Sequence, residues 1–159
     1  MESIFTTNNP NQTKKLGKLL AKEVLKTRLG KRAFVFGLRG DLGGGKTTFL
    51  QGFAKGLGVK EKITSPTFVI MRKFEIRNPK SETNSKFKIQ KFQTFYHFDC
   101  YRIENHKEIL DLCFKEILSD PQNIVAIEWA DKIKKIMPKE TIWLKFEFIS
   151  AKTRKIMLK

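Results

Sequence analysis

The chain has 159 residues, of which 40% are hydrophobic and 14 are phenylalanine, enough for one domain with a large apolar core. No run approaches the ~20 apolar residues of a membrane-spanning helix, and residues 1–7 lack the basic start and apolar stretch of a signal peptide. The two cysteines, Cys100 and Cys113, form no metal-type pair and are typical of reduced thiols. We therefore expect a single cytoplasmic domain over residues 1–159 that makes no membrane contact.

The formal net charge is +16, and the basic residues are unevenly spread. Residues 14–32 contain eight basic residues and one acidic residue, and residues 132–159 contain nine basic and two acidic residues. Such a field attracts nucleic acid or an acidic protein. An AT-rich genome, which enriches Lys, Ile, Asn and Phe together, explains the same charge. The charge alone therefore does not establish RNA binding.

The first predicted element is a helix that begins near residue 10. Asn9, Pro10 and Gln12 suit its N-cap, first and third positions. Helical spacing then predicts one apolar face, made of Leu16, Leu19, Leu20 and Val24. An apolar run at residues 33–38, bounded by basic residues, predicts a buried strand after this helix.

A glycine-rich loop follows that strand and matches the complete Walker A pattern, G-x-x-x-x-G-K-[ST]. It consists of Gly40, Asp41, Leu42, Gly43, Gly44, Gly45, Lys46 and Thr47, followed by Thr48. Backbone N–H groups of such a loop surround a phosphate, the Lys46 ammonium neutralises it, and the Thr47 hydroxyl binds Mg²⁺. Apolar residues at helical spacing predict a helix after the loop, ending at Gly58. The setting of strand, loop and helix predicts a nucleotide-phosphate site.

The second half of the chain alternates β-rich and helical patterns. We expect strands at residues 67–76, 92–99, 124–127, 141–149 and 154–158, a helix at 108–118, and a polar hairpin connection or excursion at 77–91. The fully apolar run at 124–127 is typical of a central parallel strand. The order predicts an α/β fold: a P-loop NTPase-like three-layer sandwich with a mixed, mostly parallel central sheet and an antiparallel hairpin.

Acidic and polar residues follow two of these strands. Glu128 comes directly after residues 124–127, at the sheet edge where ligands of α/β proteins bind, so it is a candidate Mg²⁺ ligand. Strand alternation predicts that His97, Asp99 and Tyr101 share one face. Asp99 there orients water or supports the metal, and Arg102 neutralises phosphate charge or docks a partner. An ordinary strand end, with an Asp99–Arg102 ion pair and a packed imidazole, explains the cluster as well.

Two further features lie next to these candidates. The hydroxyl-rich turn at residues 64–67 includes Thr67 and stands where P-loop proteins often sense the γ-phosphate, although ordinary turn chemistry suits it almost equally. Trp129, beside Glu128, packs on the phosphate loop or belongs to the core.

Together these motifs resemble the TsaE (YjeE) family, bacterial ATPases needed to make threonylcarbamoyladenosine in tRNA. The matching strings are GDLGGGKTTF at 40–49, SPTF at 65–68, H-x-D-x-Y-R at 97–102 and Glu-Trp at 128–129. The resemblance covers essentially the whole chain, and its third and fourth strings are specific to the family. It implies ATP and Mg²⁺ as ligands and TsaB and TsaD as partners, with contact to tRNA through the basic surface left open.

The resemblance also implies roles for single residues. Lys46 and Thr47 bind phosphate and Mg²⁺, and Glu128 serves the metal. Asp99 supports hydrolysis, and Thr67 lies near the γ-phosphate. Thr13 lies near the adenine and Arg154 near the nucleotide. Family members reset their partners' cycle with ATP and leave the carbamoyl transfer to those partners. In this chain Gly44 replaces the usual alanine, Cys113 stands where glycine is usual, and residues 77–91 are longer and more basic than usual.

The main alternative is a small P-loop kinase that phosphorylates a small-molecule acceptor. Such kinases need an arginine-bearing lid, whereas Arg72 and Arg77 stand in strand-like sequence. A GTPase is disfavoured because no Asn-Lys-x-Asp string occurs. A nonenzymatic RNA-binding domain explains the charge but leaves the phosphate loop without a purpose. The sequence therefore favours a slow ATPase subunit.

Overall fold

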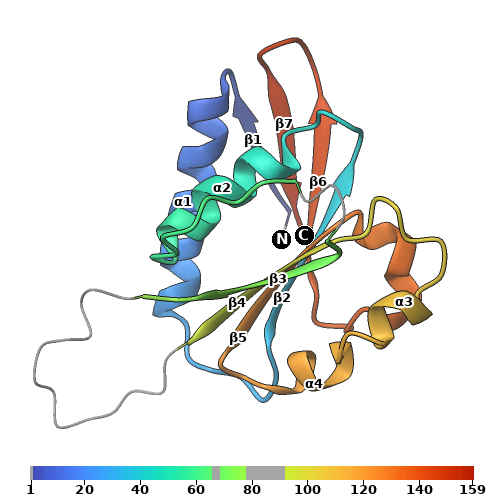
Figure 1. Ribbon diagram of the computed structural model, residues 1–159. Helices are drawn as coiled ribbons and strands as arrows, with labels where there is room; N and C mark the ends of the chain where they lie inside the picture. The colour runs from blue at the N-terminus through green and yellow to red at the C-terminus, as the bar shows by residue number, and fades with distance from the viewer. Residues whose placement is uncertain (1, 66–68, 78–91) are drawn as a thin grey trace, which may run out of the picture.

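A computed structural model describes residues 2–65, 69–77 and 92–159 and contains one seven-stranded sheet between two helical layers (Figure 1). The strands are β1 (Ser3–Thr7), β2 (Phe34–Gly40), β3 (Met71–Glu75), β4 (Thr94–Asp99), β5 (Asn123–Glu128), β6 (Ile142–Phe148) and β7 (Arg154–Leu158). The helices are α1 (Pro10–Lys26), α2 (Lys46–Gly56), α3 (Lys107–Leu110), α4 (Phe114–Ser119) and the 3₁₀ segment η2 (Ala130–Ile136). None of the helices in these ranges is long and apolar enough to cross a membrane.

The sheet has the order β1-β7-β6-β2-β5-β4-β3. Its central strands β6, β2, β5 and β4 run parallel, while β1, β7 and β3 join by antiparallel pairing. Every residue of β5 is buried, as its apolar run predicts for a central parallel strand. The predicted three-layer α/β sandwich, with its mixed, mostly parallel sheet and antiparallel hairpin, is confirmed.

Helices α1 and α2 cover one face of the sheet, and α1 begins as predicted. The Asn9 side-chain oxygen accepts from the Gln12 N–H at 2.9 Å, and the Gln12 side-chain oxygen accepts from the Asn8 N–H at 2.7 Å. The apolar face was predicted wrongly at Leu19, whose exposed fraction is 52%. Gly17 and Ala21 are buried instead, because the two helices pack with their backbones close: a Cβ on Gly17 would lie 2.2 Å from the Phe49 carbonyl oxygen.

The second layer, formed by α3, α4 and η2, corrects the prediction of a single helix at 108–118. Cys113 has a φ of 56°, in the left-handed region, so the chain turns between α3 and α4. The turn allows Ile109 and Phe114 to enter one apolar cluster beneath the sheet. A single straight helix would carry these two side chains in different directions.

Two strands also differ from the sequence prediction. β1 was not predicted, because its five residues are mostly exposed and stand at the sheet edge, held by pairing to β7. The strand expected from residue 67 begins at Met71; residues 66–68, like 78–91, lie outside the described residues. The predicted strands near 92–99, 141–149 and 154–158 correspond to β4, β6 and β7.

Candidate functional site

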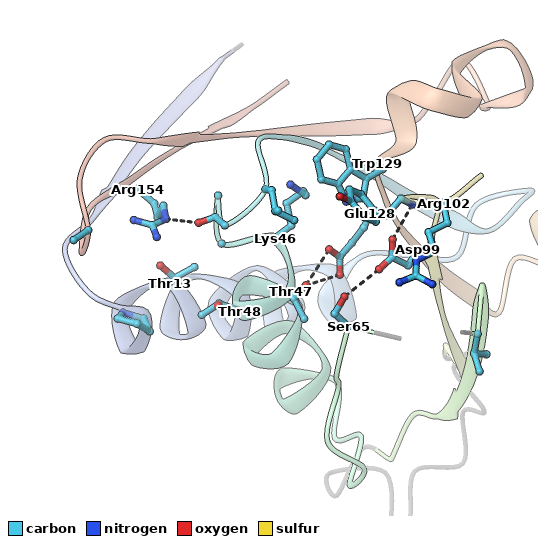
Figure 2. Close-up of a pocket in the computed structure, with 18 of the residues that line it drawn as sticks. Thr13, Lys46, Thr47, Thr48, Ser65, Asp99, Arg102, Glu128, Trp129 and Arg154 are labelled. Carbon is cyan, nitrogen blue, oxygen red and sulfur yellow. Dashed lines mark hydrogen bonds between the residues drawn. The ribbon is translucent and has the colours of Figure 1, made fainter. Parts of the chain in front are cut away.

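A cleft of about 700 Å³ lies at the carboxyl ends of the central strands (Figure 2). β2 ends at Gly40, β4 at Asp99 and β5 at Glu128, and the register of β4 with β5 sets Asp99 opposite Glu128. The lining includes Pro10, Thr13, Leu42, Gly43, Gly44, Gly45, Lys46, Thr47, Thr48, Ser65, Val69, Ile70, Asp99, Tyr101, Arg102, Glu128, Trp129, Ala151, Lys152 and Arg154. This is the sheet edge at which ligands of open α/β folds bind.

The loop between β2 and α2 forms the floor of the cleft. Gly40 has a φ of 133° and packs so closely on β6 that a Cβ would lie 2.1 Å from the Phe146 carbonyl oxygen. Further along, the Gly44 N–H donates to the Asp41 carbonyl at 3.0 Å. Leu42 at the tip is 72% exposed. The first glycine of the motif is thus required by both its backbone angle and the approach of β6.

Lys46 is held inside the curve of this loop. Its Nζ donates to the carbonyl oxygens of Gly40 and Asp41, both at 2.7 Å, and lies 4.1 Å from the centre of the Trp129 ring. Burial lowers the pKa of the Lys46 ammonium, while the charge of Glu128 opposes that shift. The positive charge is therefore fixed at the place where the loop would surround a phosphate.

Glu128 connects the loop to β4. Thr47 Oγ1 donates to both carboxylate oxygens of Glu128, at 3.0 and 3.1 Å, and His97 Nε2 lies 2.9 Å from Oε1. Both Glu128 and His97 are buried, and His97 Nδ1 has no hydrogen-bond partner in the described part of the chain. A hydroxyl and a carboxylate side by side are hard oxygen ligands, so this pair fits Mg²⁺.

Asp99 stands beside this pair with its own set of contacts. Its carboxylate accepts from the Tyr101 backbone N–H at 2.9 Å and from the Ser65 hydroxyl at 3.3 Å. Burial raises the pKa of the Asp99 carboxyl, and the negative charge of Glu128 adds to the shift. The group therefore holds a proton more readily than an exposed aspartate does.

The other side of the cleft is formed by Thr13 and Arg154, which Figure 2 shows across the loop from Asp99 and Arg102. Thr13 Oγ1 lies 2.7 Å from Thr7 Oγ1, and Arg154 Nε donates to the Gly43 carbonyl at 3.0 Å. Helix α1 and strand β7 thus both reach the cleft beside the phosphate loop, and the roles of Thr13 and Arg154 toward a nucleotide, which the family resemblance implied, stay predictions.

Tyr101, Arg102 and Trp129 surround the mouth of the cleft. Tyr101 is 46% exposed, and its ring lies 5.1 Å from that of Trp129. Strand β4 ends at Asp99, so the prediction that Tyr101 shares a strand face with His97 and Asp99 is wrong: Tyr101 lies in the following turn. Trp129 has a φ of 58°, a left-handed backbone conformation that bulky residues rarely adopt. Residues with such strained backbones cluster at functional sites in proteins.

Sequence reasoning missed part of the lining. Ser65 was considered only as one hydroxyl of a turn, and its contact with Asp99 depends on tertiary structure. Pro10, Val69, Ile70 and Lys152 also line the cleft. The sequence indicated only that Val69 belongs to a strand. Its place in the cleft wall, with 52% of the residue exposed, is visible only in the folded chain. Thr67, predicted near the γ-phosphate, lies outside the described residues.

Comparison with known proteins identifies the family. The family model described as threonylcarbamoyl adenosine biosynthesis protein TsaE matches residues 7–156. The chain belongs to the TsaE family. The TsaE protein of Bacillus subtilis strain 168 is 35% identical over 138 residues, covering 87% of this chain and 73% of that protein. The TsaE protein of Borreliella burgdorferi is 36% identical over 118 residues, covering 74% and 75%.

A solved crystal structure agrees with the fold. The crystal structure of Bacillus subtilis YdiB is similar to this chain with a TM-score of 0.64 and 28% sequence identity, covering 99% of this chain and 84% of YdiB. The resemblance to TsaE inferred from four short motifs is therefore confirmed, and with it a role in threonylcarbamoyladenosine biosynthesis for tRNA.

Proposed function

We propose that this TsaE family protein binds ATP with Mg²⁺ in the cleft and hydrolyses it slowly, as an accessory to TsaB and TsaD in modifying tRNA. The observation that carries the proposal is the convergence of Lys46, Thr47, Asp99 and Glu128, from the three elements α2, β4 and β5, on one cleft. Phosphoryl transfer to water needs little covalent chemistry from the protein, so positioned charges of this kind are what it requires.

Phosphate binding falls to the loop and Lys46. The backbone N–H groups of residues 43–47 precede or begin helix α2, so the positive end of the helix points at the same anion. Lys46 is already desolvated and held by two carbonyls, which lowers the entropy that binding would cost. Thr13 and Arg154 also line the cleft, which supports assigning them contacts to the rest of the nucleotide.

Thr47 and Glu128 are the residues that would hold Mg²⁺. Within residues 2–65, 69–77 and 92–159 no cluster of three or more His, Cys, Asp or Glu side chains forms a metal site. This suits Mg²⁺, which usually takes one or two protein oxygens and completes its shell with water and substrate phosphates. When bound, the ion supplies charge neutralisation at the phosphates. His97 keeps the Glu128 carboxylate oriented toward Thr47.

Asp99 is the residue we assign to water. Its carboxylate is fixed by Ser65 and by the Tyr101 N–H, within the same cleft as Lys46. A carboxyl with a raised pKa accepts a proton from an attacking water at a smaller cost than an ordinary aspartate does. Arg102 in the lining supplies a further positive charge near the reacting phosphate. Thr67 near the γ-phosphate remains part of this proposal.

Binding and turnover can be separated by three variants. Titration with ATP and Mg²⁺ should show binding by the wild type and by Lys145→Ala, a control that alters a sheet lysine outside the cleft. Lys46→Ala should abolish binding, because the loop loses its only buried ammonium. Asp99→Asn should bind within about threefold of wild type yet hydrolyse ATP about 100-fold more slowly. Equal turnover by Asp99→Asn and wild type would contradict the assigned role.

The accessory role has its own test. Hydrolysis should rise when TsaB and TsaD are added to this protein, and the rise should be absent with Lys46→Ala. The alternative, a small P-loop kinase, predicts a different outcome: rapid transfer of the γ-phosphate to a small acceptor without either partner. Transfer of that kind, or binding of ATP with no effect of TsaB and TsaD on turnover, would overturn the accessory ATPase.

A further inference from the structure

Helix α1 is much more basic than the segment around α3 and α4, although η2, in the same layer as α3 and α4, carries three lysines and one aspartate. Residues 10–32, which include α1, contain eight basic residues and one acidic residue, whereas residues 104–120, which include α3 and α4, contain two basic and five acidic residues. A lysine-rich composition alone would enrich exposed lysine on both of these segments. The asymmetry therefore favours a specific use for the α1 surface.

The lysines of α1 also differ from those on and next to strands β6 and β7. Lys145 and Lys155 lie 2.7 and 3.7 Å from Glu147, and Lys159 lies 3.4 Å from Glu2. On α1 only Lys26 has a carboxylate within 4.0 Å, and the ion-pair partner is Glu23 at 2.6 Å. Among the described residues, the ammonium groups of Lys14, Lys15, Lys18 and Lys22 have no carboxylate partner within that distance.

These side chains form one continuous surface. At about 100° per residue, the lysines of α1 fall within one sector of about 120°, beside the face that packs on α2. The sector consists of Lys14, Lys15, Lys18, Lys22 and Lys26, all exposed. Lys14, Lys18, Lys22 and Lys26 follow one another at about 6 Å along the helix axis, a spacing comparable with that of successive phosphates in a nucleic acid strand. We call these five residues the lysine face.

The chemistry of the lysine face suits phosphates better than a protein. Protein interfaces are enriched in aromatic residues and arginine at their centre and depleted in lysine. On α1, Leu19 is the one large apolar side chain that is more than half exposed, and no aromatic residue occurs in the helix. A lysine ammonium is a flexible point charge, which suits sequence-independent contacts to a phosphate backbone.

The lysine face is rigidly attached to the nucleotide cleft. A Cβ on Gly52 would lie 1.9 Å from the Lys14 carbonyl oxygen, and one on Gly56 would lie 2.7 Å from the Lys18 carbonyl oxygen, so α1 rests directly on the backbone of α2 (Figure 1). Helix α2 begins at Lys46 in the cleft, and Thr13, next to Lys14, lines the same cleft. The surface therefore starts at the cleft edge and cannot shift without α2.

We propose that the lysine face docks the phosphate backbone of RNA, which for a TsaE family protein means tRNA. This rests on the proposed function only in the choice of tRNA as the RNA. The contact is sequence-independent, so specificity for the modified nucleotide belongs to other proteins. The docked RNA would lie along α1 and reach the mouth of the nucleotide cleft.

Two variants with the same charge change test the proposal in the full-length protein. Lys14→Glu/Lys18→Glu/Lys22→Glu removes the lysine face, and Lys107→Glu/Lys115→Glu/Lys139→Glu changes exposed lysines outside α1 and α2. Binding of a labelled, unmodified tRNA transcript is measured by fluorescence anisotropy between 50 and 300 mM KCl, since the slope of log affinity against log salt reports phosphate contacts. Circular dichroism and ATP titration check that each variant is folded.

The lysine-face variant should bind tRNA at least about tenfold more weakly than wild type, with a salt slope reduced by about 2–3, roughly one for each lysine lost. The control variant should stay within about threefold of wild type. Equal losses in both variants would assign tRNA attraction to net charge and overturn the proposal. Unchanged tRNA binding with lost binding to TsaB and TsaD would also overturn it, in favour of an acidic protein partner. Because ATP binding is measured separately, the tRNA-binding result could be interpreted even if the protein did not hydrolyse ATP.

Discussion

Asp99 is a residue at which catalysis and stability are expected to oppose each other. Burial raises its carboxyl pKa above the usual 3.8, so the folded chain holds this proton more tightly than the unfolded chain. The unfolded state then has fewer protons bound between the two pKa values, and stability falls as pH rises through that window. Above the pKa of Asp99 in the folded chain, the free energy of unfolding stays lowered by the full effect of this shift.

Asp99→Asn should therefore stabilise the protein at pH 7.5 while slowing ATP hydrolysis. The amide keeps an oxygen for the Tyr101 N–H and a group that bonds the Ser65 hydroxyl, and it carries no charge to desolvate. Thermal unfolding at pH 7.5 and pH 4.0 checks the sign: the gain in Tm should shrink at the lower pH. A gain of equal size at both pH values would mean that the carboxyl charge is not its cause.

Cys113 is a second residue whose backbone predicts a stability change. Its φ of 56° costs a residue with a Cβ about 1 kcal/mol, and its side chain is exposed, so little packing offsets that cost. Cys113→Gly should raise the free energy of unfolding by about 1 kcal/mol, equivalent to about 2–4 °C in Tm. Cys113→Ala retains the Cβ and should show no such gain. If both variants gain equally, the thiol rather than the backbone is responsible.

At the scale of elements, the contact between α1 and α2 decides the sign of a glycine substitution. Gly→Ala inside a helix ordinarily stabilises by about 1 kcal/mol. At Gly52 the new methyl group would lie 1.9 Å from the Lys14 carbonyl oxygen, so the helices must separate. Gly52→Ala should instead destabilise the protein by about 1–3 kcal/mol, as measured by urea unfolding.

Gly30 supplies the control for that prediction. A Cβ on Gly30 would meet nothing closer than the Arg32 carbonyl oxygen at 3.8 Å. Gly30→Ala should leave stability unchanged or raise it by a few tenths of a kcal/mol, about the usual effect on the unfolded chain. A stabilising Gly52→Ala would show that α1 and α2 do not pack as closely as described.

Elements whose signals are local were predictable from the sequence. The Asn9 cap, the loop before α2 and the apolar run of β5 each need only neighbouring residues to form. β1 escaped prediction because its stability comes from pairing with β7, about 150 residues away along the chain. The exposure of Leu19 likewise depends on how closely α2 approaches α1. The break between α3 and α4 depends on the left-handed backbone angle of Cys113, which a cysteine in the sequence does not indicate.

The candidate site likewise has residues that the sequence predicts and contacts that it does not. Lys46, Thr47, Glu128 and Asp99 stand at recognisable positions at the ends of strands and in the phosphate loop, so the sequence predicts them. The contacts among them do not follow from sequence. That His97 meets Glu128 and that Ser65 meets Asp99 depends on strand register and on the path of a loop. These partners fix the geometry of the residues that the motifs identify.

At the scale of the whole molecule, the charge of +16 predicts an unusual response to salt. Like charges repel in the compact state, and the described ion pairs are mostly exposed, so their loss to screening costs little. Raising NaCl from 50 to 300 mM should therefore increase Tm, by about 2–4 °C if repulsion costs about 1 kcal/mol.

The lysine-face variant provides the comparison. Its three Lys→Glu changes each lower the net charge by two, from +16 to +10, so its Tm should depend less on NaCl than that of the wild type. A wild-type Tm that falls with NaCl would mean that screened ion pairs outweigh the repulsion.

The cleft is closed by residues from opposite ends of the described chain. Thr13 stands on α1 and Arg154 on β7, and β7 pairs on its outer side with β1. Contacts of such long sequence separation form late, because closing a long loop must precede them. A growing chain therefore has its phosphate loop long before it has a complete binding site. Under the proposed function, a fragment that stops short of β7 would therefore bind ATP more weakly than the full chain, because it lacks Arg154.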